Sequence, residues 1–299
     1  MYALAPRACN QGVKRMIPRN LIHLVPSHEG LWPEFRRNLA DLAAANPGWT
    51  QIILSDAEAL DFVRRHYGPR ELDALARIDP AYGPARSDLL RYLVLHQLGG
   101  VYFDNKSGAS RPLDQILRPE DEYLVVQWDN GPTGVDAGCG FHPELSAVED
   151  GEYINWVMIS RAGHPFLAAV IDRVLENIET YSRHRFGVGK NGTLRTTGPI
   201  ACTLAIHPIL HRHPHRRIIC TEEGLLYASS GDGSHHTLRH KLHYSRLLHP
   251  VVRPAASAPL HEKLAARLTR PLYLGHAWLR QQNRRRRDRS RRRRGLNGL

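Results

Sequence analysis

Residues 85–106, with the sequence ARSDLLRYLVLHQLGGVYFDNK, restrict the possible fold more than any other stretch of this chain. They predict a helix, a Gly-Gly turn and a short buried strand. Gly99 and Gly100 would end the helix, because glycine tolerates the positive φ that closes a helix C-terminus. Residues 101–103 are β-branched or aromatic, as is typical of strands. Asp104 would follow at the carboxyl end of the strand, where open α/β sheets bind ligands.

Two charged residues of the same helix are predicted to lie together. Asp88 and Arg91 are three positions apart, a spacing that places both side chains on one helix face. An ordinary surface ion pair has the same spacing. The glycines and Asp104 that follow favour a ligand site instead.

The elements around this segment alternate between strand and helix. Residues 17–25 and 49–54 are apolar stretches that suit buried strands, and residues 32–46 have apolar side chains at helical spacing. Ser55 and Asp56 could cap a helix that begins at Ala57. This order predicts an α/β fold with a parallel sheet and crossover helices. Further along we expect a turn at 111–114, a strand at 122–128, an irregular loop at 129–150, a helix at 166–181, a turn at 196–200, a helix at 201–210 and a strand at 218–220.

The charge of the chain is unevenly distributed. Of the net +12, residues 284–294 hold nine Arg and one Asp and carry +8, which leaves +4 for all other residues (12 − 8). A tail of this composition is predicted to be disordered. It could bind anionic lipid at a membrane surface, bind nucleic acid without specificity, or do neither. The basic pI therefore does not predict a specific nucleic-acid-binding domain.

The sequence indicates a cytoplasmic protein. Its four cysteines are widely and irregularly spaced, which favours free thiols in a reducing compartment. No stretch approaches the roughly 18 apolar residues of a membrane span. Residues 1–16 look like a leader without the apolar segment of a secretory signal. Peripheral contact with the inner face of a membrane, through the arginine tail, is an open alternative.

The central segment resembles the DxD sugar-binding region of family 32 glycosyltransferases, which include yeast-type initiating α-1,6-mannosyltransferases and bacterial capsular polysaccharide enzymes. The S-D-x-x-R-Y helix and the G-G-x-Y-x-D pattern of that family match residues 87–92 and 99–104. The resemblance covers residues 17–280. Weaker matches follow the family's order at residues 17–25, at 46–56, at Asn155 with 163–166, at 197–199, and at His276 with Trp278.

This resemblance implies a GT-A fold, which is a Rossmann-like, mainly parallel central sheet with flanking helices. The glycosyltransferase domain would occupy residues 17–280, between the leader and a disordered arginine-rich tail at 281–299. The family implies a retaining enzyme that transfers a hexose from a UDP- or GDP-sugar to a glycan or lipid-linked acceptor. Such a reaction would belong to polysaccharide or glycolipid biosynthesis.

The resemblance also implies roles for individual residues. Asp88 would bind hydroxyls of the donor sugar, and Arg91 would clamp sugar or phosphate with its fork of N–H groups. Together with Asp104, these would be the catalytic residues. The donor-binding set implied in this way is Leu24, Val25, Asp56, Asp88, Arg91, Gly99, Gly100, Tyr102, Asp104, Lys106 and Trp278, and the acceptor-side set is Asn155, Thr197 and Gly198.

One residue departs from the family pattern. Lys106 stands where the second aspartate of DxD is expected, and lysine cannot offer the carboxylate oxygen that Mn²⁺ or Mg²⁺ prefers. The metal could rest on Asp104 and another ligand such as His276, or Lys106 could partly replace it by pairing with diphosphate oxygens. A third interpretation is a degenerate site in a non-catalytic sugar-nucleotide-binding or scaffold protein.

A group of histidines could suggest a second metal site. Pro208 and Pro214 interrupt regular helix geometry there, and no Cys or acidic partner has ligand spacing. We therefore expect a solvated loop. The histidines are His207, His211, His213 and His215.

Overall fold

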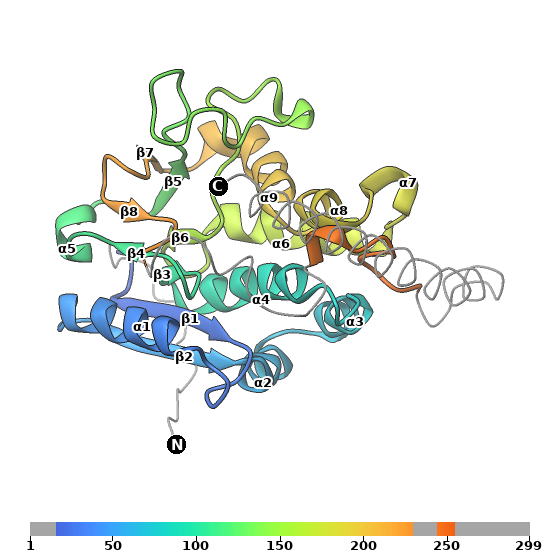
Figure 1. The fold of residues 1–299 in the computed structure, drawn as a ribbon, viewed down its shortest axis with the longest axis horizontal. Helices are drawn as coiled ribbons and strands as arrows, with labels where there is room; N and C mark the ends of the chain where they lie inside the picture. Colours follow the sequence, from blue (N-terminus) through green and yellow to red (C-terminus); the bar gives the residue numbers. More distant parts are fainter. Residues whose placement is uncertain (1–15, 230–243, 255–299) are drawn as a thin grey trace, which may run out of the picture.

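The computed structural model describes residues 16–229 and 244–254 of this chain. A six-stranded sheet with the order β2-β1-β3-β6-β5-β7 forms its centre (Figure 1). Neighbouring strands are parallel except around β6, which is antiparallel to both β3 and β5. The strands are β1 (Asn20–Val25), β2 (Thr50–Ser55), β3 (Gly100–Phe103), β5 (Tyr123–Gln127), β6 (Val157–Ser160) and β7 (Arg216–Ile219). This arrangement confirms the predicted α/β class with a mainly parallel central sheet.

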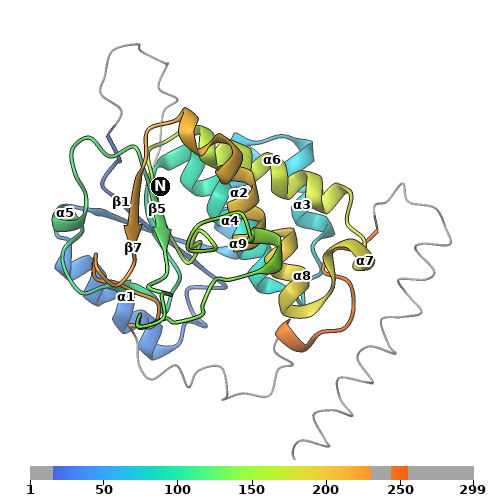
Figure 2. The same ribbon diagram turned by 90° about the horizontal axis from the view of Figure 1, so that it is seen from above.

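Helices cover both faces of the sheet (Figures 1 and 2). Side chains alternate between the faces, as a pleated strand requires, so Val101 and Phe103 pack in one apolar cluster and Tyr102 in the other. The first cluster includes α1 (Pro33–Ala45) and α5 (Leu113–Ile116). The second includes α2 (Asp56–His66), α3 (Pro69–Arg77), α4 (Gly83–Leu98), α6 (Pro165–Glu179) and α9 (Pro199–Ile206). The other helical elements are α7 (Arg183–Phe186), α8 (Gly189–Thr196), η1 (Pro143–Leu145), η2 (His207–Arg212) and η4 (Tyr244–Arg246).

Helix α4 is the central helix and leads directly into β3. Its apolar residues are buried almost all round, which explains why the sequence lacks a one-sided apolar stripe. Gly99 ends the helix at φ +63°, and Gly100 follows at φ +120°. The predicted helix, glycine stop and strand are therefore confirmed.

The reversed direction of β6 brings its beginning to the carboxyl ends of its neighbours. Phe103 at the end of β3 pairs with Val157 at the start of β6. The residues just before β6 are not part of a strand, but the backbone N–H of Asp104 donates to the carbonyl of Trp156 at 2.8 Å. Asn155 therefore arrives at the same edge of the sheet as Asp104.

Several local predictions need correction. The turn expected at 111–114 leads into the short helix α5. The helix expected at 201–210 ends at Ile206, and a 3₁₀ helix follows because Pro208 cannot donate to the α-helical ladder. His207 and His211 thus lie in that 3₁₀ helix, not in a loop. In α2, Ser55 alone is the N-cap, in a capping box with Glu58, and Asp56 is the first helical residue.

A C-terminal strap, residues 244–254, packs across the helical side of the molecule. The N–H of Asp79 donates to the carbonyl of Val251, and the N–H of Arg253 donates to the carbonyl of Arg77, each at 2.8 Å. The Tyr82 hydroxyl donates to the carbonyl of His249 at 2.6 Å. The strap therefore connects η4, which packs on α8, with the C-terminal end of α3.

Some predictions concern residues outside the described part of the chain. They are most of the leader (residues 1–15), the arginine tail at 281–299, the possible metal ligand His276 and the predicted donor-binding residue Trp278. Within the described residues, we find no helix of the length and apolar character that crossing a membrane requires.

Candidate functional site

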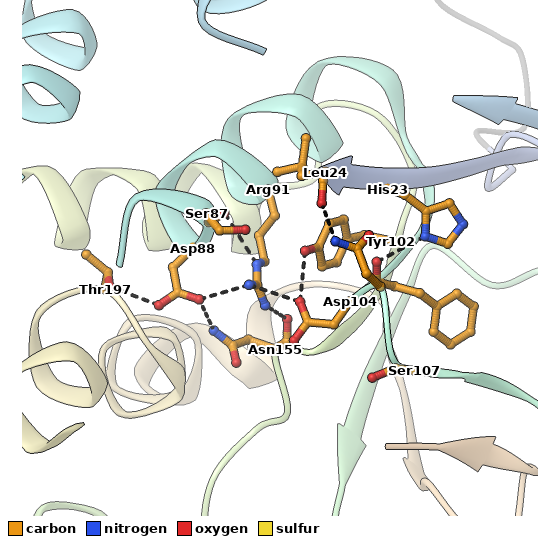
Figure 3. A network of polar contacts seen from close by, with 12 residues as sticks. His23, Leu24, Ser87, Asp88, Arg91, Tyr102, Asp104, Ser107, Asn155 and Thr197 are labelled. Atoms are coloured by element: carbon orange, nitrogen blue, oxygen red, sulfur yellow. Dashed lines mark hydrogen bonds and ion pairs between the residues drawn. The ribbon is translucent and has the colours of Figure 1, made fainter. Parts of the chain in front are cut away.

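Arg91 lies at the centre of a buried charged network at the carboxyl end of β3 (Figure 3). Its Nη2 is 3.2 Å from Oδ1 of Asp88 and 3.1 Å from Oδ1 of Asp104. The side chains of Arg91 and Asp88 are 5% and 8% exposed, whereas that of Asp104 is 28% exposed. Nη1 of Arg91 donates to the backbone carbonyl of Asn155. One guanidinium therefore links two carboxylates, of which Asp104 is open to a ligand.

Asp88 is held by residues from two distant parts of the chain. The Thr197 hydroxyl donates to its Oδ2 at 2.9 Å, and the Asn155 amide donates to its Oδ1 at 3.1 Å. Burial raises the pKa of Asp88 to about 6, because loss of water outweighs the opposite effects of Arg91 and of these two hydrogen bonds. The carboxylate is thus fully partnered but has little contact with solvent.

Asp104 is fixed from the strand side. The Tyr102 hydroxyl donates to Oδ1 of Asp104 at 2.8 Å. The Tyr102 ring also lies beneath the guanidinium of Arg91, with its centroid 4.8 Å from Cζ. Since Oδ1 accepts from Tyr102 and pairs with Arg91, Oδ2 is the oxygen of this carboxylate that is left for a ligand.

A tight turn follows Asp104 and carries Lys106. The N–H of Ser107 donates to the carbonyl of Asp104 at 2.8 Å, and the Asn105 amide donates to the carbonyl of Leu24 at 2.9 Å. Nζ of Lys106 lies over the ring of Tyr227, 3.6 Å from its centroid. The turn therefore joins the end of β3 to the end of β1 and to the segment after β8 (Leu225–Leu226), which pairs with the short strand β4 (Gly108–Ala109).

Other predicted donor-binding residues lie along the same edge. Leu24 and Val25 end β1, and Val25 is paired in register with Ser55 at the end of β2. Asp56, exposed at the first position of α2, follows Ser55 directly. These three residues thus lie at the carboxyl ends of neighbouring parallel strands.

The structure separates Gly99 and Gly100 from this edge. Both glycines are buried at the amino end of β3, opposite the end that carries Asp104. A Cβ on Gly99 would be 2.5 Å from the backbone N of Ala162, so the glycine is needed for close packing. In the structure these glycines shape the turn from α4 into β3 and not the edge that carries Asp104, and their contact with a donor stays a prediction.

The residues predicted on the acceptor side lie at or next to the contacts of Asp88. Asn155 and Thr197 both donate to its carboxylate, and Gly198 caps α9 beside Thr197. Asn155 and Thr197 therefore support Asp88 directly. His276 and Trp278 lie outside the described residues, so no position is assigned to them.

Sequence reasoning did not identify three tyrosines around the network. The Tyr92 hydroxyl donates to the carbonyl of Thr197 and accepts from the Asn155 amide, both at 2.8 Å. Burial, together with the charges of Asp88, Tyr227 and Asp104, raises the pKa of Tyr244 to about 12. Tyr92 could have been found from its place in the S-D-x-x-R-Y pattern. Tyr227 and Tyr244 carry no such sequence signal.

The described residues do not fit a divalent cation held as in a DxD site. They contain no group of three or more His, Cys, Asp or Glu side chains arranged to bind a metal. Asp104 is the one carboxylate that the motif contributes to the turn, and the position two residues later is Lys106. The histidine group at 207–215 likewise forms no such cluster.

Comparison with known proteins places the segment that builds most of this site. Residues 33–123 match the family described as "Glycosyltransferase sugar-binding region containing DXD motif". This segment is similar to the sugar-binding region of that family. The match confirms the resemblance to a glycosyltransferase family that was predicted from the sequence. Relatives of this chain include proteins named as mannosyltransferases.

Two curated relatives are similar over more than half of the chain. "Mannosyl phosphorylinositol ceramide synthase SUR1" of Saccharomyces cerevisiae is 34% identical over 186 residues, which cover 58% of this chain and 43% of that relative. "Initiation-specific alpha-1,6-mannosyltransferase" of Candida albicans is 26% identical over 168 residues, covering 52% of this chain and 42% of that relative. The chain thus spans less than half the length of these relatives.

A similar solved structure is "PaToxG Glycosyltransferase", with a TM-score of 0.48 and 15% sequence identity. The superposition covers 66% of this chain and 71% of that one.

Proposed function

We propose that this protein is a retaining glycosyltransferase that transfers a hexose from a UDP- or GDP-sugar to a glycan or lipid-linked acceptor. The observation that carries the proposal is the network in which Arg91 joins buried Asp88 to accessible Asp104 at the carboxyl end of β3. Carboxylates can accept hydrogen bonds from sugar hydroxyls, and a guanidinium can stabilise a departing diphosphate. The names of the relatives favour mannose as the hexose and make a glycolipid acceptor the first to test.

The donor would lie across the carboxyl ends of β1 and β3. Leu24, Val25 and Asp56 would be on the nucleotide side, whereas Asp104 and Arg91 would meet sugar and phosphate. The side chain of Asp88 is 8% exposed, so Asp88 would act on the donor mainly indirectly, by orienting Arg91. The acceptor would approach from the side of loop 129–150.

The test is a transfer assay with UDP- and GDP-hexoses, GDP-mannose among them, and a lipid-linked or oligosaccharide acceptor. Replacement of Asp104 by Ala should lower transfer by about 100-fold or more, because it removes the accessible carboxylate and leaves Arg91 underneutralised. Asp73→Ala is the matched control. Asp73 is 60% exposed on α3, and its ion pair with Arg77 is a long one, at 4.0 Å. Full activity of the Asp104 variant would contradict the proposal.

A second candidate is a non-catalytic sugar-nucleotide-binding or scaffold protein, which Lys106 at the second DxD position favours. This candidate predicts that the wild-type chain binds a nucleotide sugar without turning it over. Turnover of any donor, with or without Mn²⁺, excludes it.

A further inference from the structure

The charge of the site differs from that of an intact DxD motif. Asp88 and Asp104 contribute two negative charges, and Arg91 and Lys106 contribute two positive charges, so the sum is zero. An aspartate at position 106 would change the sum to −2, because one positive charge is lost and one negative charge is gained. An anionic diphosphate would meet repulsion in that case unless a cation bridged the carboxylates.

The backbone of Lys106 is held firmly in place. Its carbonyl accepts from the N–H of Ser229 at 2.9 Å. The Asn38 amide donates to the carbonyls on both sides of Lys106, at 2.9 Å to Asn105 and at 3.0 Å to Ser107. The Ser107 hydroxyl also donates to the carbonyl of Tyr227 at 2.8 Å. The turn thus fixes where the lysine stem begins, two residues beyond Asp104.

The side chain of Lys106 is positioned by an aromatic group. Its ammonium lies 3.6 Å from the centroid of Tyr227, a cation–π contact. Trp128 and Trp156 support Tyr227, with ring centroids 5.5 Å from it in each case. Tyr227 itself is 42% exposed, so the ammonium rests on a ring at the surface of the molecule.

From these observations we propose that Lys106, positioned by Tyr227, supplies the positive charge that a divalent cation supplies in DxD sites. The anionic diphosphate of the donor then binds without a divalent metal. This inference rests on the proposed function, and it assigns Tyr227 as a positioning residue for Lys106. It predicts that the described carboxylates bind no Mn²⁺ tightly, in agreement with the absence of a metal-binding cluster among the described residues.

The decisive measurement is calorimetric binding of GDP and UDP to the full wild-type chain, in EDTA and in Mn²⁺. We expect affinities that agree within about threefold in the two conditions, because the lysine charge is always present. Wild-type binding that requires Mn²⁺ would overturn the inference and leave the proposed function intact. Failure to bind either nucleotide or any nucleotide sugar in both conditions would overturn the proposed function, and the inference with it.

Variants distinguish the loss of the Lys106 charge from a general effect of charge reversal on the folded protein. Lys106→Asp should weaken nucleotide binding in EDTA by about 30-fold or more and recover much of the loss in Mn²⁺, since it restores a carboxylate. Its Mn²⁺ binding, followed by electron paramagnetic resonance without nucleotide, should exceed that of the wild type. Lys190→Asp, at an exposed position of α8, is the matched charge control and should behave as the wild type. Equal binding of the Lys106 variant and the wild type in EDTA would contradict the proposal.

Tyr227 can be tested independently. Tyr227→Leu removes the ring face and should weaken nucleotide binding in EDTA by about threefold to tenfold. Tyr227→Phe keeps the ring and should bind better than the leucine variant in the same buffer. A leucine variant as good as wild type would remove Tyr227 from the proposal.

Discussion

At the scale of single residues, Asp88 shows how burial and partnership act against each other. Thr197, Asn155 and Arg91 all stabilise its charged form, yet burial still raises its pKa to about 6. A protein keeps such a carboxylate at a cost, which points to a role beyond stability. Its role here is to hold Arg91 in one orientation beside Asp104.

This balance predicts a pH dependence of stability. Between about pH 4 and 6 the native state binds more protons at Asp88 than the unfolded state does, so the free energy of unfolding falls as pH rises through this window, on the order of 3 kcal/mol. Asp88→Asn should lack this contribution. Urea unfolding at several pH values would measure the difference between variant and wild type. Identical pH dependence in the two proteins, with exposed Asp73→Asn as control, would contradict the raised pKa.

At the scale of elements, local sequence signals predicted α4, its glycine stop and β3. These elements depend on side-chain spacing and on glycine, which can be seen within a short window. The direction of β6 could not be predicted in this way, because it depends on which strands flank it. The hydrogen-bond partners of Asp88 could not be predicted either, since the hydrogen bond from Thr197 to Asp88 joins residues 109 positions apart.

The α4–β3 junction gives a steric prediction. Gly99 and Gly163 both have φ +63°, but a Cβ on Gly99 would meet the backbone N of Ala162 at 2.5 Å and Cδ of Pro18 at 2.8 Å, whereas a Cβ on Gly163 meets nothing within 4 Å. Gly163→Ala should lower the free energy of unfolding by about 1 kcal/mol and Gly99→Ala by about 3 kcal/mol or more. Denaturant unfolding of both variants measures the difference. Equal losses would mean that backbone conformation, rather than packing, makes Gly99 necessary.

At the scale of the whole molecule, the strap at 244–254 connects helices on the side of the sheet where Asp88 lies. It brings Tyr244 close to the charged network, and it binds the chain near Asp79 and Tyr82. Sequence reasoning predicted no structural role for residues 244–254. Its backbone hydrogen bonds to Arg77, Asp79 and Tyr82 join residues more than 160 positions apart, for which no local pattern exists.

Loss of the Tyr82 hydroxyl should loosen the strap. In Tyr82→Phe the carbonyl of His249 and the N–H of Gly189 both lose a buried partner, which should cost about 1 to 3 kcal/mol. Relative to the wild type, hydrogen exchange should accelerate more at the amides of Val251 and Arg253 than at the amides of β1. Tyr67→Phe, which removes a hydroxyl bonded to the carbonyl of Leu93 far from the strap in sequence, is the control. Uniform acceleration across the protein would instead indicate global destabilisation.

Asp88 is far in sequence from Asn155 and Thr197, and this distance has a consequence for synthesis of the chain. When the ribosome has made α4 and β3, neither Asn155 nor Thr197 yet exists, so Asp88 has Arg91 but lacks both neutral donors. Domains fold as units, and contacts of long sequence separation form late. The nascent amino-terminal half must therefore carry Asp88 without these two hydrogen-bond donors, and any ligand of this network can assist folding only after Thr197 has left the ribosome.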